Sequence, residues 1–511
     1  MFLSNAEQIR DADHIMIQEM DFPGILLMEE AGKKATEKLL KLYPDKDDFI
    51  IIAGPGNNGG DGWVIARYLH LWGKHVQVYC SYDPLMLQGD ARINFDIVRH
   101  LPIAYGIWNP QHSDRILDEG NPPVLVDALL GTGIRETLRD PIATMLAYWR
   151  EKSLPVVAID LPSGLSAETG TMINEVLSAE HTLTFQLPKI CHHVYPAAGA
   201  CGKIHVLDIG IWPPVIERLS IQRRVLDDRF VKDTYLPRTS DSHKGSFGHA
   251  LVVGGSYSMS GAIAMTAQAI MRSGAGLCTV LCPAECSQTL MVRTPEVMCL
   301  EGEGPFFSVE DVASFLDLLP GKDVVVIGPG MRQEPATLEF LESVLEEVEV
   351  PIVLDADALN LLAQMDNYES FLSPETVLTP HPGEMQRLIG DPVQGQRLEV
   401  AEQFAQETAS ILVLKGAGTI IALPDGKTFV NPSGNPGMAT GGSGDVLTGI
   451  IGGLIAQGYT PAVAAPLGAY LHGKTGDMLA EKKGMEGLLA SDMAESLPSV
   501  WKDTLVKTEM S

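Results

Sequence analysis

The 511-residue sequence lacks the cysteine pattern of a disulfide framework or a zinc site. Its seven cysteines are an odd number, are scattered along the chain, form no CxxC pair and have no histidines at metal-binding spacing. Small secreted domains depend on dense disulfides, whereas intracellular proteins keep their thiols reduced. We therefore expect a reducing compartment and exclude a disulfide-stapled fold.

The chain also lacks a positive charge balance, because its formal net charge is -28 at pH 7. Proteins that hold DNA, RNA or an anionic membrane need a basic surface to displace counterions. We therefore expect no nucleic-acid partner and no membrane partner. A small anion such as a nucleotide phosphate can still bind, because backbone N–H groups and helix N-termini hold anions whatever the total charge.

No long hydrophobic run is uninterrupted, and no secretion signal opens the chain. The longest apolar stretch, residues 450–471, is broken by Gly458, Pro461 and Pro466, which predicts a pair of buried helices and no membrane span. The N-terminus has neither the basic region nor the apolar core of a signal peptide, and Ser4 with Glu7 predicts a capping box at the start of a helix. We expect a cytoplasmic protein.

Short β-branched runs alternate with helical stretches along the chain, which is typical of parallel sheets with helices on both faces. In the first part, strands are predicted at 49–53, 75–79, 124–126, 156–159, 182–185 and 204–206. The pattern lapses between about 211 and 238 and restarts at 250–253, 277–281, 324–327, 352–354, 376–378 and 411–414. We predict an α/β protein with two three-layer domains, residues 1–220 and 221–511, and a site at the C-terminal edge of each sheet.

The most specific motif is the run NPGMATGGSGD at 435–445, followed by an apolar helical stretch to Ala456. Its glycines let the backbone approach an anion closely, and the helix that begins there offers unpaired N–H groups to a phosphate. Asp445 in the first turn should stay ionised in the field of the helix dipole and accept a proton from a hydroxyl. The alternative is a helix-capping aspartate, but a cap needs no four glycines before it.

Three other strands of the second half end in polar residues. The turn 415–419 supplies Lys415 and could contact a second phosphate or a ribose, although alone it would more often be an ordinary hairpin turn. Asp355 and Asp357 could orient substrate or bind Mg²⁺ through water, and capping of the next helix is an equal alternative. His381 lies between two prolines, which favours a ligand contact over a core position.

In the first half, GPGNNGGDG at 54–62 satisfies GxGxxG, which is weak evidence alone. We expect a polar turn before a helix at 63–71, and a small-ligand or ion site. Asn58, Asp127 and Ser163 lie at neighbouring strand ends and offer oxygen ligands of low total charge, which suit K⁺ better than a transition metal. Asp160 at the same edge is free to act on a proton.

One motif is misleading. Residues 468–475 match the Walker A pattern literally, but a P-loop must follow a strand, and this segment lies inside an Ala-rich stretch that runs to Lys483. We interpret it as a helix surface.

In their order along the chain, these motifs resemble the bifunctional NAD(P)H-hydrate repair enzymes. LMEEAG (27–32), GPGNNGGDG, DALLGTG, DLPSG and TFQLPK resemble the epimerase domain, and HKGSFG (243–248), LVVGGS, GPG (328–330), LDADALN, TPHPGE, LKGAGT and NPGMATGGSGDVLTG resemble the dehydratase domain. The resemblance implies a Rossmann-like epimerase domain followed by a ribokinase-like, ADP-dependent dehydratase domain. The chain departs from the family pattern after Lys189, where the family commonly has a glycine soon after the lysine and this chain has Ile190-Cys191-His192.

The resemblance implies that the first domain interconverts the epimers of NADH or NADPH hydrated on the nicotinamide ring, with Asp160 as catalytic residue. The substrate residues it implies there are Asn57, Asn58, Gly59, Gly60, Asp61, Gly131, Thr132, Gly133, Ile134, Arg135, Glu136, Thr137 and Asp160. The K⁺ ligands are Asn58, Asp127 and Ser163.

The second domain would dehydrate the S form with ADP and Mg²⁺, giving AMP and phosphate. The nucleotide residues implied are Lys415, Gly416, Ala417, Gly418, Thr419, Asn435, Gly437, Thr440, Gly441, Gly442, Ser443 and Gly444, and the substrate residues are Ala262, Gly330, His381 and the catalytic Asp445. A homo-oligomer is expected. The rival hypothesis is a hydroxymethyl or sugar kinase with a non-catalytic N-terminal module, because the same fold and glycine-rich loop serve those kinases.

Overall fold

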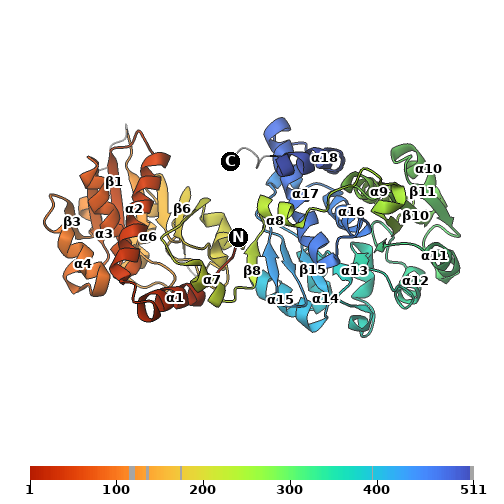
Figure 1. Ribbon diagram of the computed structural model, residues 1–511, viewed down its shortest axis with the longest axis horizontal. Coiled ribbons are helices and arrows are strands. Elements are labelled where there is room, and N and C mark those ends of the chain that lie inside the picture. Colours follow the sequence, from red (N-terminus) through yellow and green to blue (C-terminus); the bar gives the residue numbers. More distant parts are fainter. Residues whose placement is uncertain (114–120, 134–136, 173–174, 394, 507–511) are drawn as a thin grey trace. The chain divides into compact units, whose positions relative to one another are not determined.

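The computed structural model describes residues 1–113, 121–133, 137–172, 175–393 and 395–506. The chain divides into two compact units, Met1–Arg223 and Arg224–Ser511, and each unit is built around its own sheet (Figure 1).

The first unit contains a seven-stranded sheet of order β3-β2-β1-β4-β5-β6-β7, in which every neighbouring pair is parallel. The strands are β1 (Asp48–Ala53), β2 (His75–Cys80), β3 (Ala104–Ile107), β4 (Val124–Ala128), β5 (Val156–Ile159), β6 (His181–Phe185) and β7 (Lys203–Leu207). The helices are α1 (Ala6–His14), α2 (Gly24–Leu42), α3 (Asn57–Leu71), α4 (Gly89–Val98), α5 (Pro110–Ser113), α6 (Ile142–Arg150) and α7 (Pro213–Arg218). The strand order reverses between β1 and β4, the place where doubly wound sheets bind ligands.

The first sheet is buried on both faces, which makes this unit a three-layer structure. Side chains alternate along a strand, so Phe49 and Ile51 of β1 face the cluster formed with α1 to α4. Ile50 and Ile52 face a second cluster that contains Trp149 of α6. The continuous apolar run of β1 is thus explained by a strand with helices on both sides.

The second unit contains a ten-stranded sheet of order β11-β10-β9-β12-β13-β14-β15-β16-β17-β8. Neighbours from β11 through β15 are parallel, and β16 pairs antiparallel with β15 and with β17. The strands are β8 (Arg223–Val225), β9 (His249–Val253), β10 (Leu277–Pro283), β11 (Met298–Gly302), β12 (Val324–Ile327), β13 (Ile352–Leu354), β14 (Thr376–Leu378), β15 (Ile411–Leu414), β16 (Ile420–Ala422) and β17 (Thr428–Val430). The helices are α8 (Asp228–Thr234), α9 (Ser260–Ser273), α10 (Ala284–Arg293), α11 (Val312–Leu318), α12 (Pro335–Leu345), α13 (Asp357–Leu362), α14 (Pro382–Ile389), α15 (Arg397–Glu407), α16 (Ser443–Ala456), α17 (Pro461–Lys483) and α18 (Ala490–Val506).

Helix α16 is the buried centre of the second unit. All its residues from Val446 to Ala456 are buried, and two glycines allow it to press against α9. A Cβ at Gly449 would lie 2.4 Å from the carbonyl oxygen of Thr266, and one at Gly453 would lie 1.9 Å from Ser273 Oγ. This contact fixes the N-terminus of α16, and with it Asp445, over the sheet edge. The predicted pair of buried helices at 450–471 is confirmed as part of α16 and α17, and none of the helices in the described ranges has the length and apolar character of a membrane crossing.

The sequence missed five strands, and a physical reason is visible for each. β3, β8 and β11 lie at sheet edges, and β3 and β11 are largely exposed, so they carry no apolar run. β16 and β17 are only three residues long. Short or exposed strands give little periodicity to detect.

Three local predictions are corrected. Helix α3 begins at Asn57, so most of the polar glycine-rich segment forms the first turns of the helix, where a turn before the helix was predicted. The capping box of α1 is formed by Asn5 and Gln8 in place of Ser4 and Glu7. The Walker-like segment is helical as predicted, but most of it is buried inside α17 and forms no helix surface.

Candidate active sites

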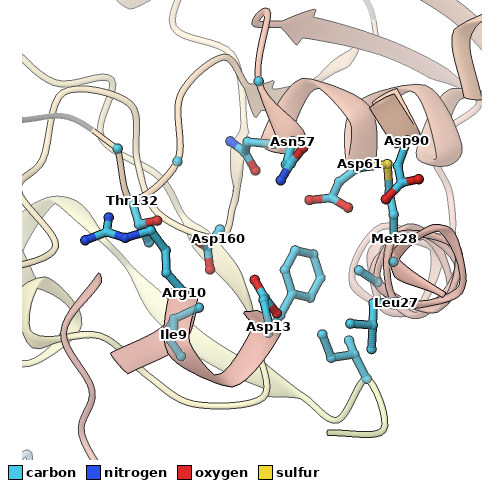
Figure 2. Close-up of a pocket in the computed structure, with 18 of the residues that line it drawn as sticks. Ile9, Arg10, Asp13, Leu27, Met28, Asn57, Asp61, Asp90, Thr132 and Asp160 are labelled. Carbon is cyan, nitrogen blue, oxygen red and sulfur yellow. The ribbon is translucent and has the colours of Figure 1, made fainter. Parts of the chain in front are cut away.

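The first unit encloses a cavity of about 810 Å³ at the switch point of its sheet. Figure 2 shows Asp13, Asp61 and Asp160 reaching into it, Asp13 from α1 and Asp61 from α3. Lys189, which follows β6, completes the charged lining. The cavity therefore gathers carboxylates around one buried ammonium group.

Asp160 is held in an unusual conformation by three partner residues. Its φ is 66°, a left-handed value that costs a non-glycine residue energy and is concentrated at functional sites. Lys189 Nζ donates to Asp160 Oδ1 at 2.5 Å, and Thr184 Oγ1 donates to the same oxygen at 3.0 Å. His192 Nδ1 accepts from the backbone N–H of Lys189, so its Nε2 carries the proton and donates to the carbonyl oxygen of Asp160 at 2.9 Å.

These contacts explain why Asp160 is ionised. Burial would raise the pKa of Asp160, but the charge and hydrogen bond of Lys189 outweigh it and hold the pKa below its usual value. The neighbouring carboxyl groups behave in the opposite way. Burial, with the charges of Asp160 and Asp13, raises the pKa of Asp61 well above its usual value. The cavity thus contains carboxyl groups with different proton affinities, which suits acid–base chemistry.

The predicted substrate residues of the first unit fall into four groups. Those that line the cavity are Asn57, Asn58, Asp61, Gly131, Thr132, Gly133 and Asp160. Gly59 and Gly60 do not line it and serve packing: a Cβ at Gly59 would lie 1.9 Å from the carbonyl oxygen of Gly54, and one at Gly60 would lie 2.7 Å from Met28. Thr137 lines a neighbouring hollow of about 230 Å³. Ile134, Arg135 and Glu136 lie outside the described residues.

The predicted cation ligands lie together beside this cavity. Ser163 donates to Asp127 through Oγ at 2.7 Å and through its backbone N–H at 2.8 Å, and Leu129 N donates to Asp127 Oδ1 at 3.2 Å. Asn58 Nδ2 donates to the carbonyl oxygen of Leu130 at 2.8 Å. Asn58 Oδ1 is buried and has no hydrogen-bond partner within the described ranges. A buried, unsatisfied oxygen next to a buried carboxylate fits a cation.

The second unit has its own lysine–aspartate pair at the ends of β13 and β15. Lys415 Nζ donates to Asp355 Oδ1 at 2.7 Å, and Thr448 Oγ1 donates to Asp355 Oδ2 at 2.7 Å. Glu384 Oε2 lies 3.8 Å from the same ammonium group. Burial would raise the pKa of Asp355, but Lys415 and Thr448 outweigh it and lower the pKa. The turn 415–419 is a hairpin between β15 and β16, and its lysine nevertheless reaches the sheet edge.

Asp445, in the first turn of α16, faces this pair. Burial and the charge of Asp355 raise the pKa of Asp445 to about 7, against the opposing charge of Lys415. The effect expected of the helix dipole on Asp445 is opposed by desolvation and a like charge, which raise its pKa. A carboxyl group that titrates near neutral pH is poised to accept a proton from a substrate.

The glycine-rich run before Asp445 is held at both ends and open in the middle. Asn435 Nδ2 and the N–H of Gly434 donate to Asp477 of α17, both at 3.0 Å. Gly442 is the N-cap of α16 with a φ of 90°. A Cβ at Gly441 would meet nothing within 4 Å, and one at Gly444 would lie 3.2 Å from Lys415 Nζ. Among the described residues, the N–H groups of Gly441, Gly442 and Gly444 have no hydrogen-bond acceptor, so they can meet an anion beside an ammonium group.

Among the other predicted nucleotide-binding residues, Gly437 packs against Met485, since a Cβ at Gly437 would lie 2.5 Å from the carbonyl oxygen of Met485. Ser443 Oγ lies 3.4 Å from His472 Nε2, and the N–H of Ser443 donates to the carbonyl oxygen of Thr440. Arg397 NH1, which sequence reasoning missed, donates to the carbonyl oxygen of Ala417 at 2.7 Å and so holds the 415–419 turn.

The predicted substrate residues of the second unit surround the same edge. His381 caps α14, since its Nδ1 accepts from the N–H groups of Gly383 and Glu384 at 3.0 and 3.2 Å. Burial, with the charge of Lys415, lowers the pKa of His381. A Cβ at Gly330 would lie 3.4 Å from the Cβ of Ala262, so these two residues are neighbours.

Sequence reasoning missed residues whose side chains carry the charge balance of each site. Lys189 ends the TFQLPK motif, which by itself indicates no role for it, and Asp13 lies in an amphipathic helix without a motif. Glu384 ends the TPHPGE motif, which indicates only a polar strand end. All three need the tertiary structure to be recognised, although the lysine shortly after the buried strand β6 is an available signal for Lys189.

The two units define an α/β protein with a Rossmann-like domain followed by a ribokinase-like domain that carries a glycine-rich run before α16. The family model for the YjeF-related protein N-terminus matches residues 25–191, and the model for NAD(P)H-hydrate dehydratase matches residues 250–499. A ribokinase-like superfamily protein from Enterococcus faecalis has a TM-score of 0.50 and 33% identity, covering 55% of this chain and 96% of that chain.

Two full-length relatives complete the comparison. The bifunctional NAD(P)H-hydrate repair enzyme of Moorella thermoacetica is 39% identical, with 98% of this chain and 97% of that protein covered. The protein of the same name from Coxiella burnetii is 37% identical over 95% of this chain and 96% of its own length. The chain belongs to the family of bifunctional NAD(P)H-hydrate repair enzymes.

Proposed function

We propose that this protein repairs hydrated NADH and NADPH, interconverting the S and R epimers in the first unit and dehydrating the S form at the expense of ADP in the second. The supporting observation is the presence, in one chain, of two separate carboxylate sites, each built on a buried lysine–aspartate pair. Similarity to repair enzymes over nearly the whole chain favours this function over a lone kinase with a non-catalytic module.

In the first unit, the proposed substrate occupies the 810 Å³ cavity with its ring near Asp160. Asn57, Asp61 and residues 131–133 line the space around it. Asp160 is ionised, so it accepts a proton or stabilises positive charge that develops on the ring. Lys189 and His192 act by fixing the charge and position of Asp160.

We assign K⁺ to Asn58, Asp127 and Ser163. The unsatisfied Asn58 Oδ1 and the buried Asp127 carboxylate support this proposal, because oxygen donors with one negative charge suit a monovalent cation. A bound cation would supply positive charge near residues 131–133, which line the cavity. Ser163 holds Asp127 in place through two hydrogen bonds.

In the second unit, Asp445 accepts the proton of the ring hydroxyl while the phosphoryl group of the nucleotide is transferred to that oxygen. Hydroxide leaves a carbon poorly and phosphate leaves well, and the lone pair of the ring nitrogen drives the departure. Lys415 and the N–H groups of Gly441, Gly442 and Gly444 support phosphate binding at this loop, whereas the N–H of Ser443 already donates to Thr440. Phosphoryl transfer is therefore a means to dehydration.

Mg²⁺ is proposed to arrive on the nucleotide, where it neutralises phosphate charge. Asp355 is a poor ligand for it, because its two oxygens already accept from Lys415 and Thr448. Glu384 and Asp445 at the same edge keep oxygens that could contact the ion or its waters. Use of ADP in preference to ATP, assembly into a homo-oligomer and a cytoplasmic location stay predictions.

Assays of the purified full-length protein with hydrated NADH and either ADP or ATP test the proposal. We expect recovery of the absorbance of reduced nicotinamide together with stoichiometric phosphate and AMP when ADP is supplied. A stable phosphorylated alcohol, with no recovery of that absorbance, would reject repair in favour of a kinase.

A further inference from the structure

One wall of the first cavity comes from the N-terminal segment, which lies outside the residues matched by the family model. Ile9, Arg10 and Asp13 of α1 line the cavity together with Ile17. Their spacing places them on one face of a helix, and the π-helical turn Ile15–Glu19 that follows α1 keeps Ile17 on that face. The Asn5–Gln8 capping box fixes the start of the helix.

Asp13 differs from Asp160 in its partners. Neither Asp13 nor Asp61 has a side-chain hydrogen bond to any described residue, whereas Asp160 accepts from Lys189 and Thr184. Asp61 is only 9% exposed and faces the cavity, as Figure 2 shows for all three carboxyl groups. A buried carboxyl group without a partner is costly in its ionised form, so the cavity surface contains groups that favour binding a proton.

We propose that Asp13 is a catalytic acid of the epimerase site, donating a proton to the ring hydroxyl of the hydrated nicotinamide opposite the ionised Asp160. This inference rests on the proposed function. Asp13 comes from α1 and Asp160 from the end of β5, so the two carboxyl groups approach the cavity from different walls (Figure 2). Inversion at one carbon requires groups that can act from two sides.

The reaction balances in two steps. In the first, the Asp13 proton passes to the hydroxyl, the carbon–oxygen bond breaks, and water leaves while the nitrogen lone pair forms a C=N⁺ bond. In the second, water adds to the opposite face, the electron pair returns to nitrogen, and the released proton passes to Asp160 and through water back to Asp13. The carboxylates stabilise the cationic ring between the steps.

The electrostatics of the cavity agree with this role. Burial raises the pKa of Asp13 to about 6, against the opposing charge of Lys189, and the charge of Asp160 adds to the rise. The other ionisable groups that line the same cavity are Arg10, Asp61 and Asp90. Since the protonated form of Asp13 is the active one, epimerisation should slow as the pH rises above about 6.

The experiment compares Asp13→Asn, Asp13→Glu and the control Asp11→Asn in the full-length protein, with epimer interconversion of hydrated NADH followed by chromatography without nucleotide. Asp11 is an exposed residue of the same helix. We expect Asp13→Asn to lower kcat about 100-fold or more and to remove the alkaline fall of the pH profile, while KM changes little. Asp13→Glu should keep the alkaline fall and stay within about tenfold of wild type, and Asp11→Asn should match wild type.

The outcomes separate this inference from the proposed function. If wild-type protein does not epimerise hydrated NADH, the proposed function of the first unit fails. If wild type does epimerise and folded Asp13→Asn keeps its rate, the role of Asp13 is overturned. If Asp13→Asn does not fold, the wild-type profile decides: a kcat that stays flat from about pH 5 to 8 overturns the proposal, and an alkaline fall retained by Asp13→Glu supports it.

Discussion

The two candidate sites each contain a lysine–aspartate pair, but the pair has a different proposed role in each. In each, a lysine holds an aspartate ionised, with Lys189 Nζ 2.5 Å from Asp160 and Lys415 Nζ 2.7 Å from Asp355, and one member of each pair, Lys189 or Asp355, is buried. In the first unit the ionised aspartate itself faces the cavity. In the second it is saturated by hydrogen bonds, and its charge helps to raise the pKa of Asp445 to about 7. In the proposed mechanism, the first pair therefore supplies a reactive carboxylate, and the aspartate of the second pair raises the pKa of its neighbour Asp445.

Replacing each proposed catalytic carboxylate tests whether the two sites are independent, and the largest effect is expected for Asp445→Asn. The amide cannot accept the hydroxyl proton, so dehydration should fall about 100- to 10,000-fold. Epimerisation in the same preparation should be unchanged and serves as the internal control. A folded variant that loses both activities would refute the model of two sites.

Asp160→Asn should produce the reciprocal result. We expect epimerisation to fall about 100-fold or more, because the ionised carboxylate is lost, while dehydration of the S epimer continues. Separate assays on the resolved epimers measure both rates. An unchanged epimerisation rate would exclude Asp160 from catalysis.

Replacing Lys189 or Lys415 tests how much each lysine–aspartate pair contributes to stability. Lys189→Met and Lys415→Met each leave a buried aspartate without its counterion, which typically costs about 3–5 kcal/mol of stability. We expect each to destabilise its own unit in denaturant titrations followed by probes in that unit. The exposed Lys203→Met provides the control and should leave the unfolding midpoint unchanged.

The pH dependence of dehydration should reflect Asp445. Only its carboxylate form accepts a proton, so kcat should rise with pH to about 7 and level off above, falling about tenfold per pH unit below. The profile of kcat at saturating substrate and nucleotide measures this. A rate that is constant between about pH 5 and 8 would show that another group is the base.

The smallest effect concerns the cation. Exchange of KCl for NaCl at constant ionic strength should lower epimerisation by about a few-fold, because the proposed K⁺ ligands include the unsatisfied Asn58 Oδ1. Dehydration with the same nucleotide should respond less. Equal responses of both activities would argue against a cation site restricted to the first unit.

The glycine-rich segments show how far sequence reasoning reached. Asp445 ends a distinctive glycine-rich run and Asp160 opens DLPSG directly after an apolar strand, so the sequence points to both. The GPGNNGGDG segment was expected as a loop since glycine disfavours helices, yet α3 starts at Asn57. The reason is tertiary: a side chain at Gly59 would collide with Gly54, so the glycines permit close packing.

The sequence by itself determined the α/β class, most of the parallel strands and the two acidic residues at the centre of the proposed chemistry, because strand patterns and glycine-rich runs are local. Only the tertiary structure decided which side chains share a cavity and which of them carry protons. Asp13 and Asp160 lie far apart in the sequence but line the same cavity, and Asp355 contacts Lys415, 60 residues further along the chain. Proton affinity depends on burial and on charges brought close by folding, which no local pattern records.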